Sequence, residues 1–324
     1  MVYDLKENYG IDNSDISYCD FSNLTEIQHI QQLLEQLGHF VSMIGSPMDF
    51  TKEIKNKTYK KYDLIFNFAE GYKSRNRESL VPALCELYKI PYTFSDCHAM
   101  DLTLHKHQLL LFAESLGITI PKGFLYIPNV HNKSYIQQKC KELNLCFPIV
   151  SKPNREGTSM GLTFSSSLQE LINNVEKTVY TYQQEIRCDE YIAGHEIAVP
   201  ILGSGQKSIA LGFVEYQNLD SSPIEHYYTT LKISGNHKTV YQSFGHKIDE
   251  QIIKTALLIH RSVPCYDLSR IDMRLRDGIP YLLEVTPIPA LNPGSTFEFC
   301  AARYGISPTN LYQKIIESTM ERYG

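Results

Sequence analysis

One segment constrains the fold of this chain more than any other: residues 272–286, Asp-Met-Arg-Leu-Arg-Asp-Gly-Ile-Pro-Tyr-Leu-Leu-Glu-Val-Thr. A central Asp-Gly with apolar residues on both sides is a strong signal for the turn of a β-hairpin. The hairpin carries one acid on each strand, Asp272 and Glu284. A two-residue loop places Asp272 opposite Leu283, whereas one extra residue, in the loop or in a bulge, places it opposite Glu284.

Two carboxylates side by side on one sheet face repel each other, so this pairing requires a cation nearby. A hard divalent ion is the simplest candidate. Two solvated acids on an exposed sheet face explain these residues equally well when they are taken alone. The rest of the chain has to decide between the two interpretations.

The composition describes a globular protein that carries no general affinity for polyanions. The chain has 324 residues, 43% hydrophobic and 21% charged, which is enough for a sizeable core and two or three domains. Its net charge of −5 predicts no binding to nucleic acid or to an anionic membrane. We find no secretory pattern and no apolar run of about 20 residues, and therefore expect a cytoplasmic protein. None of the eight cysteines forms a Cys-x-x-Cys pair, so we expect reduced thiols rather than a zinc site.

The chain divides into three expected domains, residues 1–95, 96–187 and 188–324. The first alternates helix and strand, which favours a parallel sheet with helices on both faces. Its expected helices are 25–37 and 79–88, and its expected strands are 41–44, 64–68 and 91–93. The second has a helix at 104–116 and strands at 124–127 and 147–152. The third has strands at 197–202, 209–216, 269–275 and 281–285 and helices at 250–262 and 310–322.

Two lysines, Lys106 and Lys152, lie at the start of segments that could receive an anion. Lys152 ends a strand, and the loop that follows, Gly157-Thr158-Ser159-Met160-Gly161, has amides and hydroxyls that can surround phosphate oxygens. An ordinary turn is the alternative, because the loop is neither a Walker A sequence nor a dinucleotide fingerprint. Lys106 starts a helix, whose N-terminus could also receive an anion. Solvated side chains are the alternative for Lys106 and for the isolated Lys232.

Further polar residues stand at positions where ligands bind. Glu196 begins a strand and could contact a ribose hydroxyl or simply water. Arg270 shares a strand face with Asp272 and could serve an oxyanion, or form a structural salt bridge to Glu284. Glu70 begins a charged loop, 70–78, after a strand; this is where ligands bind in open α/β sheets, although solvated loops are common there.

Ser295 follows the polar turn Asn292-Pro-Gly294. Its hydroxyl and the amides of the turn could receive a carboxylate. The alternative is an ordinary turn in which Ser295 caps the next helix.

Taken together, these segments resemble the ATP-grasp superfamily and, within it, the D-alanine–D-alanine ligase family. The resemblance covers nearly the whole chain. It implies an α/β and α+β architecture, with an N-terminal parallel-sheet domain followed by two domains that clasp ATP. The matching motifs are Lys152-Pro-x-Arg-Glu-Gly-x-Ser-x-Gly161, Glu190-Tyr-Ile-x-Gly-x-Glu196, Arg270-Ile-Asp272, Leu-Glu284-Val-x-Pro, Asn67-Phe-Ala-Glu-Gly71 and Ile90-Pro-Tyr-Thr-x-Ser95.

The resemblance implies roles for individual residues. Those for ATP are Lys106, Lys152 and loosely Lys232 on the phosphates, Gly157, Thr158 and Ser159 covering them, Glu190, Tyr191 and Ile192 along the adenine, and Glu196 on the ribose. Those for the metal, Mg²⁺ or alternatively Mn²⁺, are Asp272, Glu284 and Thr286. Lys152, Ser159 and Arg270 are the implied catalytic residues, and Glu70, Arg270, Ala290 and Ser295 the implied substrate contacts.

The chain departs from the family pattern at three places. Thr286 replaces the usual Asn and leaves a second metal ion open, and Ala290 replaces the usual Gly of the oxyanion site. The segment from Asp20 to Glu26 lacks the Ser-x-Glu motif that orients the first D-alanine.

The implied reaction is ATP-dependent joining of a carboxylate to an amine through an acyl phosphate. The expected partners are small amino-acid or carboxylate substrates, with a homodimer as a possible assembly. Two alternatives stay open: a natural-product or other amino-acid ligase of the same mechanism, and a nucleotide-binding protein without turnover.

Overall fold

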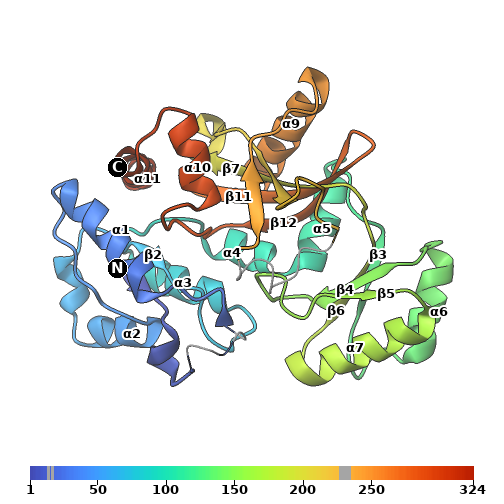
Figure 1. The fold of residues 1–324 in the computed structure, drawn as a ribbon. Coiled ribbons are helices and arrows are strands. Elements are labelled where there is room, and N and C mark those ends of the chain that lie inside the picture. The colour runs from blue at the N-terminus through green and yellow to red at the C-terminus, as the bar shows by residue number, and fades with distance from the viewer. Residues whose placement is uncertain (13–14, 16–17, 226–234) are drawn as a thin grey trace.

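The structure is a computed structural model that describes residues 1–12, 15, 18–225 and 235–324. The described residues form three sheets, which follow one another along the chain (Figure 1). The N-terminal part and the four-stranded central sheet lie on either side, and the C-terminal elements lie above and between them.

The N-terminal part forms the expected parallel sheet, but a small one. Strand β1 pairs in parallel with β2, and single parallel bridges join Val2 to Gly45 and Ile65 to Tyr92. The strand expected at 41–44 is wrong, because only the bridge at Gly45 forms there. The elements are β1 (Val2–Tyr3), η1 (Lys6–Tyr9), α1 (Leu24–Gln36), α2 (Pro47–Lys55), η3 (Thr58–Lys61), β2 (Asn67–Phe68), η4 (Arg77–Ser79) and α3 (Leu80–Tyr88).

The central part is an antiparallel sheet in the order β3-β6-β4-β5, with helices packed on one face. Ile149 of β4 packs with Ile136 of α6 and Val175 of α7. Because side chains alternate along a strand, Val150 and Lys152 point to the opposite face, toward the C-terminal sheet. The elements are α4 (Cys97–Leu104), α5 (Lys106–Ser115), β3 (Gly123–Tyr126), α6 (Lys133–Glu142), β4 (Ile149–Pro153), β5 (Thr163–Ser165), α7 (Leu168–Tyr182) and β6 (Ile186–Glu190).

The C-terminal part is built on a sheet in the order β10-β9-β7-β11-β12, to which β8 adds beside β7. The strand expected at 209–216 is split into β8 and β9, because Gly212 between them has φ +95°. Helix α9 buries Ile252, Ala256 and Ile259 against this sheet. The elements are β7 (His195–Leu202), η5 (Gly205–Lys207), β8 (Ile209–Ala210), β9 (Val214–Asn218), β10 (His237–Val240), α9 (His246–Ser262), β11 (Leu268–Arg276), β12 (Ile279–Thr286), α10 (Thr296–Arg303) and α11 (Pro308–Tyr323).

The second domain boundary expected from the sequence, at 187, falls inside β6. Strand β6 pairs on both sides within the central sheet. We therefore propose that this boundary lies between Glu190 and His195, where β6 ends and β7 begins.

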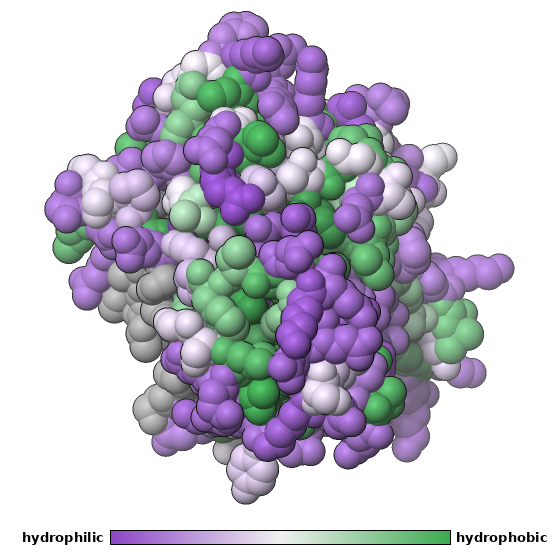
Figure 2. All heavy atoms as spheres, turned by 90° about the vertical axis from the view of Figure 1, so that its right-hand side faces the viewer, coloured by the Kyte–Doolittle hydropathy of each residue, from purple (hydrophilic) through white to green (hydrophobic). Residues whose placement is uncertain are grey.

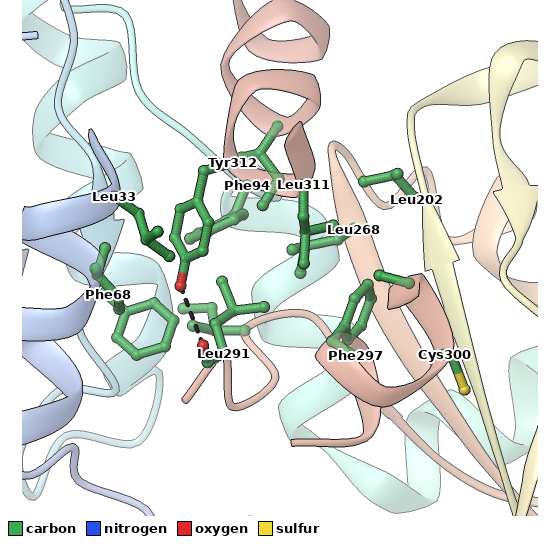
Figure 3. Packing of buried hydrophobic residues seen from close by; sticks show 14 of the residues in the cluster. Leu33, Phe68, Phe94, Leu202, Leu268, Leu291, Phe297, Cys300, Leu311 and Tyr312 are labelled. Carbon is green, nitrogen blue, oxygen red and sulfur yellow. Dashed lines mark hydrogen bonds between the residues drawn. The ribbon is translucent and has the colours of Figure 1, made fainter. Parts of the chain in front are cut away.

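One hydrophobic cluster joins the two ends of the chain. It contains Leu33 of α1 and Phe68 of β2 together with Leu311 and Tyr312 of α11 (Figure 3). The hydroxyl of Tyr312 donates to the carbonyl of Leu291 at 3.1 Å, so the ring is both buried and fixed in direction. The N-terminal part is therefore held against the C-terminal sheet by a shared core.

A buried carboxylate reinforces this junction. Asp267 is fully buried and accepts hydrogen bonds from the amide of Phe94 at 2.7 Å and from the hydroxyls of Ser318 at 2.8 Å and Thr319 at 2.7 Å. Arg322 lies 3.8 Å away. One side chain thus joins the end of the N-terminal part, α11 and the start of β11.

His260 supplies a test of stability against pH. It is fully buried between Ser269 and the carbonyl of Gly203, and burial lowers its pKa to about 4. The unfolded chain takes up a proton near pH 6.5, whereas the folded chain resists it down to about pH 4, so stability should fall as pH drops through that window, by up to about 3 kcal/mol. Urea unfolding at several pH values should show a smaller loss in His260→Gln. Equal losses in both proteins would contradict this assignment.

No helix in the part of the chain that the structure describes is both long and apolar enough to cross a membrane. Figure 2 shows the side of the molecule that carries α6 and α7; hydrophilic residues cover most of it, with hydrophobic residues in smaller patches between them.

Candidate active site

The two acids of the hairpin face each other. Asp272 pairs with Glu284 across β11 and β12, so both side chains lie on one sheet face. The turn nevertheless has only two residues, Asp277 and Gly278, both with positive φ. The extra residue is a bulge on β12: Met273 pairs with Leu282, and Leu283 is inserted before Glu284. The expected pairing is confirmed, and a bulge rather than a longer loop produces it.

Each acid is held by a cation. Arg270 donates two hydrogen bonds of 2.8 Å to Asp272, and Lys106 lies 2.8 Å from Glu284. The salt bridge from Arg270 to Glu284 considered from the sequence is therefore wrong, because the guanidinium chelates Asp272 instead. Arg270 also reaches the Thr286 hydroxyl at 3.4 Å, which places Thr286 on the same face as the acids, as expected.

Lys106 is the first residue of α5, and the loop after β4 holds that helix end. The amide of Lys106 donates to the carbonyl of Asn154 at 3.0 Å, and the amide of His107 donates to the Asn154 side chain at 2.8 Å. These amides are consequently not open to an anion. The side chain of Lys106, rather than the helix terminus, faces the site.

The side chain of Lys152, on β4, is 13% exposed. Its ammonium is 3.6 Å from the Asp189 carboxylate, and burial lowers the pKa of Lys152. Arg187 donates to the other oxygen of Asp189 at 2.5 Å, so Lys152 has only a share of this carboxylate. A lysine placed this way is available to phosphate oxygens.

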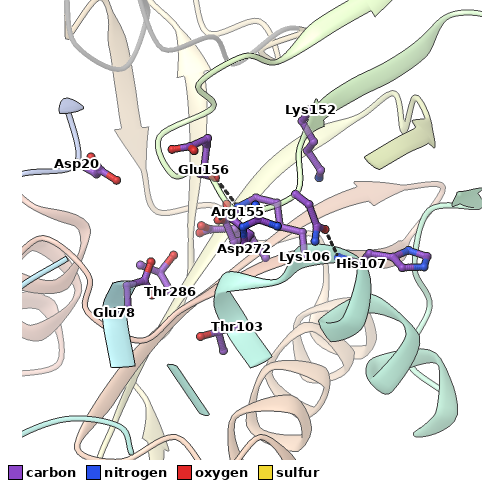
Figure 4. Close-up of polar contacts among 12 residues, drawn as sticks. Asp20, Glu78, Thr103, Lys106, His107, Lys152, Arg155, Glu156, Asp272 and Thr286 are labelled. Atoms are coloured by element: carbon purple, nitrogen blue, oxygen red, sulfur yellow. Dashed lines mark hydrogen bonds and ion pairs between the residues drawn. The ribbon is translucent and has the colours of Figure 1, made fainter. Parts of the chain in front are cut away.

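A cavity of about 350 Å³, here called the cleft cavity, lies between the central and C-terminal sheets. This is within the usual size range of small-molecule sites. Its walls contain most of the predicted site residues, and Figure 4 labels Lys106, Lys152 and Asp272 among them. These are Lys106, Lys152, Ser159, Glu190, Tyr191, Ile192, Glu196, Arg270, Asp272, Glu284, Ala290 and Ser295.

The acids expected near the nucleoside are already engaged with the protein. Glu190 accepts from the amide of Lys122 at 3.0 Å, and Glu196 lies 3.5 Å from Arg274 across the strand pair. Both still line the cleft cavity. Their roles toward a ribose or an adenine remain predictions.

A second cavity, here called the inner cavity, has about the same volume and lies between the N-terminal loops and the end of β12. It contains the other predicted residues, Glu70, Gly157, Thr158 and Thr286. The loop 157–161 thus faces both cavities, with Ser159 on the cleft side and Thr158 on the inner side. The two cavities share Lys106, Arg270, Glu284, Ala290 and Asn292.

The inner cavity also contains charged residues that the sequence did not single out. Arg77 and Glu78, at the end of the charged loop, are buried rather than solvated. Asp20 reaches the same cavity from the loop before α1, and Glu26 reaches it from the first turn of α1; this is the segment where the expected Ser-x-Glu motif is missing. The only sequence signal for them was the charge density of these two loops.

Two further predicted residues are Lys232 and Ser295. Lys232 lies outside the described residues. Ser295 is the N-cap of α10 and accepts from the amide of Glu298 at 3.3 Å, so the capping alternative is correct, although Ser295 also lines the cleft cavity.

Comparison with known proteins agrees with this geometry. The family model "D-ala D-ala ligase C-terminus" matches residues 112–317. A D-alanine–D-alanine ligase of Maridesulfovibrio salexigens is 27% identical over 296 residues, covering 91% of this chain and 92% of that protein.

Two solved structures show the same fold. The D-alanine–D-alanine ligase from Bacillus anthracis complexed with ATP has a TM-score of 0.74 at 21% identity, covering 92% of this chain and 91% of that one. The VanG D-Ala:D-Ser ligase from Enterococcus faecalis has a TM-score of 0.67 at 22% identity, covering 79% and 73%.

Two sheets enclose a cleft lined by paired acids and lysines, and the family model matches the chain across this region; together they identify an ATP-grasp ligase, an enzyme that uses ATP to form a carbon–nitrogen bond. Because the family model matches more than half of this chain, the chain belongs to the D-alanine–D-alanine ligase family.

Proposed function

We propose that this chain joins two small amino acids with ATP, activating the carboxylate of one and forming an amide with the amine of the other. The observation that carries the proposal is the meeting of two cavities at Lys106, Arg270 and Glu284. A nucleotide in the cleft cavity and an amino acid in the inner cavity would bring phosphate and carboxylate together at that junction.

The proposed reaction has two steps. The γ-phosphoryl group passes from ATP to a carboxylate oxygen, which gives an acyl phosphate and ADP. The second amine then attacks the carbonyl carbon, and phosphate leaves with loss of a proton from the amine. The chain contributes position and charge rather than a nucleophile: Lys106 and Lys152 hold phosphate oxygens, and Arg270 lies where negative charge develops.

The acids of the hairpin fit a divalent cation such as Mg²⁺. Asp272 and Glu284 face each other, and the Thr286 hydroxyl lies on the same face. Within the described residues no three His, Cys, Asp or Glu side chains gather as a metal site. Two carboxylates suit Mg²⁺, which completes its shell with water and phosphate oxygens. When bound, such an ion neutralises charge on the phosphates.

Replacing Thr286 with asparagine tests the metal assignment. An amide oxygen is a better ligand than a hydroxyl, so Thr286→Asn should keep or increase the apparent affinity for Mg²⁺, read from the Mg²⁺ dependence of phosphate release. A sharp loss of turnover at saturating Mg²⁺ would show that Thr286 has a different role.

The relatives make D-alanine the leading substrate candidate, although the first loop here has Asp20 and Glu26 in place of the usual motif. The direct experiment is a screen of amino-acid pairs, in both enantiomers, for ATP-dependent phosphate release with product masses measured. A new dipeptide mass with stoichiometric phosphate supports the proposal. The proposal would be refuted if the protein binds ATP but releases no phosphate with any pair, and if hydroxylamine traps no acyl group.

Ser295 provides a test of the amine-side substrate. Ser295→Ala should raise the KM of the second amino acid while leaving the ATP affinity nearly unchanged, because Ser295 lines the cleft cavity three residues after Asn292, where this cavity meets the inner cavity. Loss of the cap should also lower stability by about 1 kcal/mol. Steady-state kinetics and urea unfolding separate the two effects; a loss of stability with unchanged KM would restrict Ser295 to capping.

A further inference from the structure

The inner cavity holds the acyl donor if the proposed function is correct, and the present inference rests on that function. The donor must present its carboxylate at the junction formed by Lys106, Arg270 and Glu284. The rest of the donor then extends into the inner cavity, away from the nucleotide. What lines that remaining space determines which amino acid fits.

Four carboxylates from the N-terminal region line this space: Asp20, Glu26, Glu70 and Glu78. Glu26 is engaged by the amide of Leu291 at 3.4 Å, and the other three are Asp20, Glu70 and Glu78. Figure 4 shows Asp20 and Glu78 on the same side of the site as Thr286. Among the cations that line the cavity, Lys106 is engaged with Glu284 and Arg270 with Asp272. The acids from the N-terminal region therefore outnumber the cation that remains for them.

That cation is Arg77, and the acids share it. Its Nη2 lies 3.4 Å from Asp20 and 3.6 Å from Glu78, while its Nη1 donates to the carbonyl of Arg155 at 2.6 Å. Neither ion pair is a short, well-directed one. If all three carboxylates are ionised, one guanidinium leaves about two negative charges without compensation.

The hydrogen bonding of these acids is also incomplete. The Glu78 side chain is only 9% exposed, and its ion pair with Arg77 is 3.6 Å long. One oxygen of Asp20 is buried and lacks a partner among the described residues. Buried carboxylates without donors are unfavourable, and a bound ligand that supplies N–H groups removes that cost.

The titration of the cluster agrees with a shortage of positive charge. Burial, together with the nearby carboxylates of Asp20 and Glu284, raises the pKa of Glu78 to about 7 against the lowering effects of Arg77 and Lys106. Burial also raises the pKa of Glu70 well above its ordinary range, with Glu78 and Asp20 adding to the effect.

We propose that the acyl donor is a small amino acid with a second cationic group, such as a diamino acid, whose side-chain ammonium binds among Asp20, Glu70 and Glu78. The α-ammonium compensates one of the two excess charges, and the side-chain ammonium compensates the other. A neutral amino acid leaves one carboxylate without a counter-charge. The volume of about 350 Å³ accommodates a donor larger than alanine.

The test measures the donor alone. Hydroxylamine traps an acyl phosphate: its nitrogen attacks the carbonyl carbon, phosphate leaves, and a coloured hydroxamate complex reports the product. The matched donors are 2,4-diaminobutyrate and norvaline, which have the same shape and differ by one ammonium in place of a methyl group; ornithine and norleucine form a second pair. We expect kcat/KM to be at least about tenfold higher for the cationic member of each pair.

Variants identify the carboxylates responsible. Glu78→Gln and Asp20→Asn keep the side-chain shape, and each should reduce the cationic preference, the ratio of the kcat/KM values for 2,4-diaminobutyrate and norvaline, by about tenfold. Two variants are used so that a failure of one to fold does not remove the test. Asp63→Asn, which changes an exposed acid, is the matched control and should retain the full preference.

The outcomes separate the two proposals. Equal or higher kcat/KM for norvaline overturns the cationic donor and leaves the ligase function standing. A cationic preference that persists unchanged in both variants overturns the assignment to this cluster. No hydroxamate and no phosphate release with any amino acid, in a protein that binds MgATP, overturns the proposed function and this inference with it.

Discussion

Replacing Lys152 with alanine should reduce ATP-dependent turnover by about 10²–10³-fold while the fold stays intact, because a preorganised charge at a developing phosphate charge is worth about that much. Lys152 is partly buried on β4 with only a shared carboxylate for a partner, so little structure depends on it. The measurement is phosphate release with the best amino-acid pair from the screen.

The matched control for this prediction is Lys177→Ala, which removes an exposed lysine from α7 and should turn over normally. Thermal unfolding of both variants should match the unmodified protein within a few degrees. Unchanged turnover in Lys152→Ala would remove this residue from the phosphate site.

Replacing Asp267 with alanine should lower the free energy of unfolding by about 3–5 kcal/mol. The change leaves the amide of Phe94 and the hydroxyls of Ser318 and Thr319 without their acceptor in a fully buried place, and it removes the anion beside Arg322. Urea unfolding measures the loss.

The control is Asp63→Ala at an exposed site, which should change stability by no more than about 0.5 kcal/mol. An effect of the same small size at Asp267 would mean that water or rearranged side chains replace the carboxylate. It would also mean that the junction between the N-terminal part and α11 depends on the hydrophobic cluster alone.

The hairpin shows which features of the site local sequence can predict. Its turn and its two strands follow from Asp277-Gly278 and the flanking apolar residues, and the facing of Asp272 and Glu284 follows once an extra residue is assumed. The position of the extra residue was not predictable, because one more residue in the loop and a bulge at Leu283 both bring Asp272 opposite Glu284. The strand β12 lies at the edge of the sheet, and next to the bulge the amide of Leu282 donates to the carbonyl of Thr119 at 2.9 Å, a contact that no local pattern contains.

The two lysines show a different limit. Lys106 and Lys152 were identified by their positions at a helix start and a strand end. Their actual partners, Glu284 and Asp189, lie 178 and 37 residues further along the chain, and Asn154 takes the helix end that the sequence left open. Such pairs depend on tertiary contacts that no local pattern contains.

The charged loop 70–78 marks where sequence reasoning was least informative. Charged loops are usually solvated, yet Arg77 and Glu78 are buried. The cause lies elsewhere in the chain, since Asp20 and the carbonyl of Arg155 close over Arg77. The acidity of the inner cavity is therefore a property of the assembled fold rather than of any one segment.

The bulge on β12 has a consequence for how the cleft is built. In a regular strand successive side chains point to opposite faces, so a wall can use only every second residue. The inserted Leu283 breaks this alternation, and both Leu283 and Glu284 line the cleft cavity. The apolar side chain of Leu283, which suits a flat ring, and the carboxylate of Glu284, which suits a charged group, are therefore one peptide unit apart on one strand. Any tilt of β12 would move both together, so the spacing between ring and charge is set by covalent geometry rather than by the packing of separate elements.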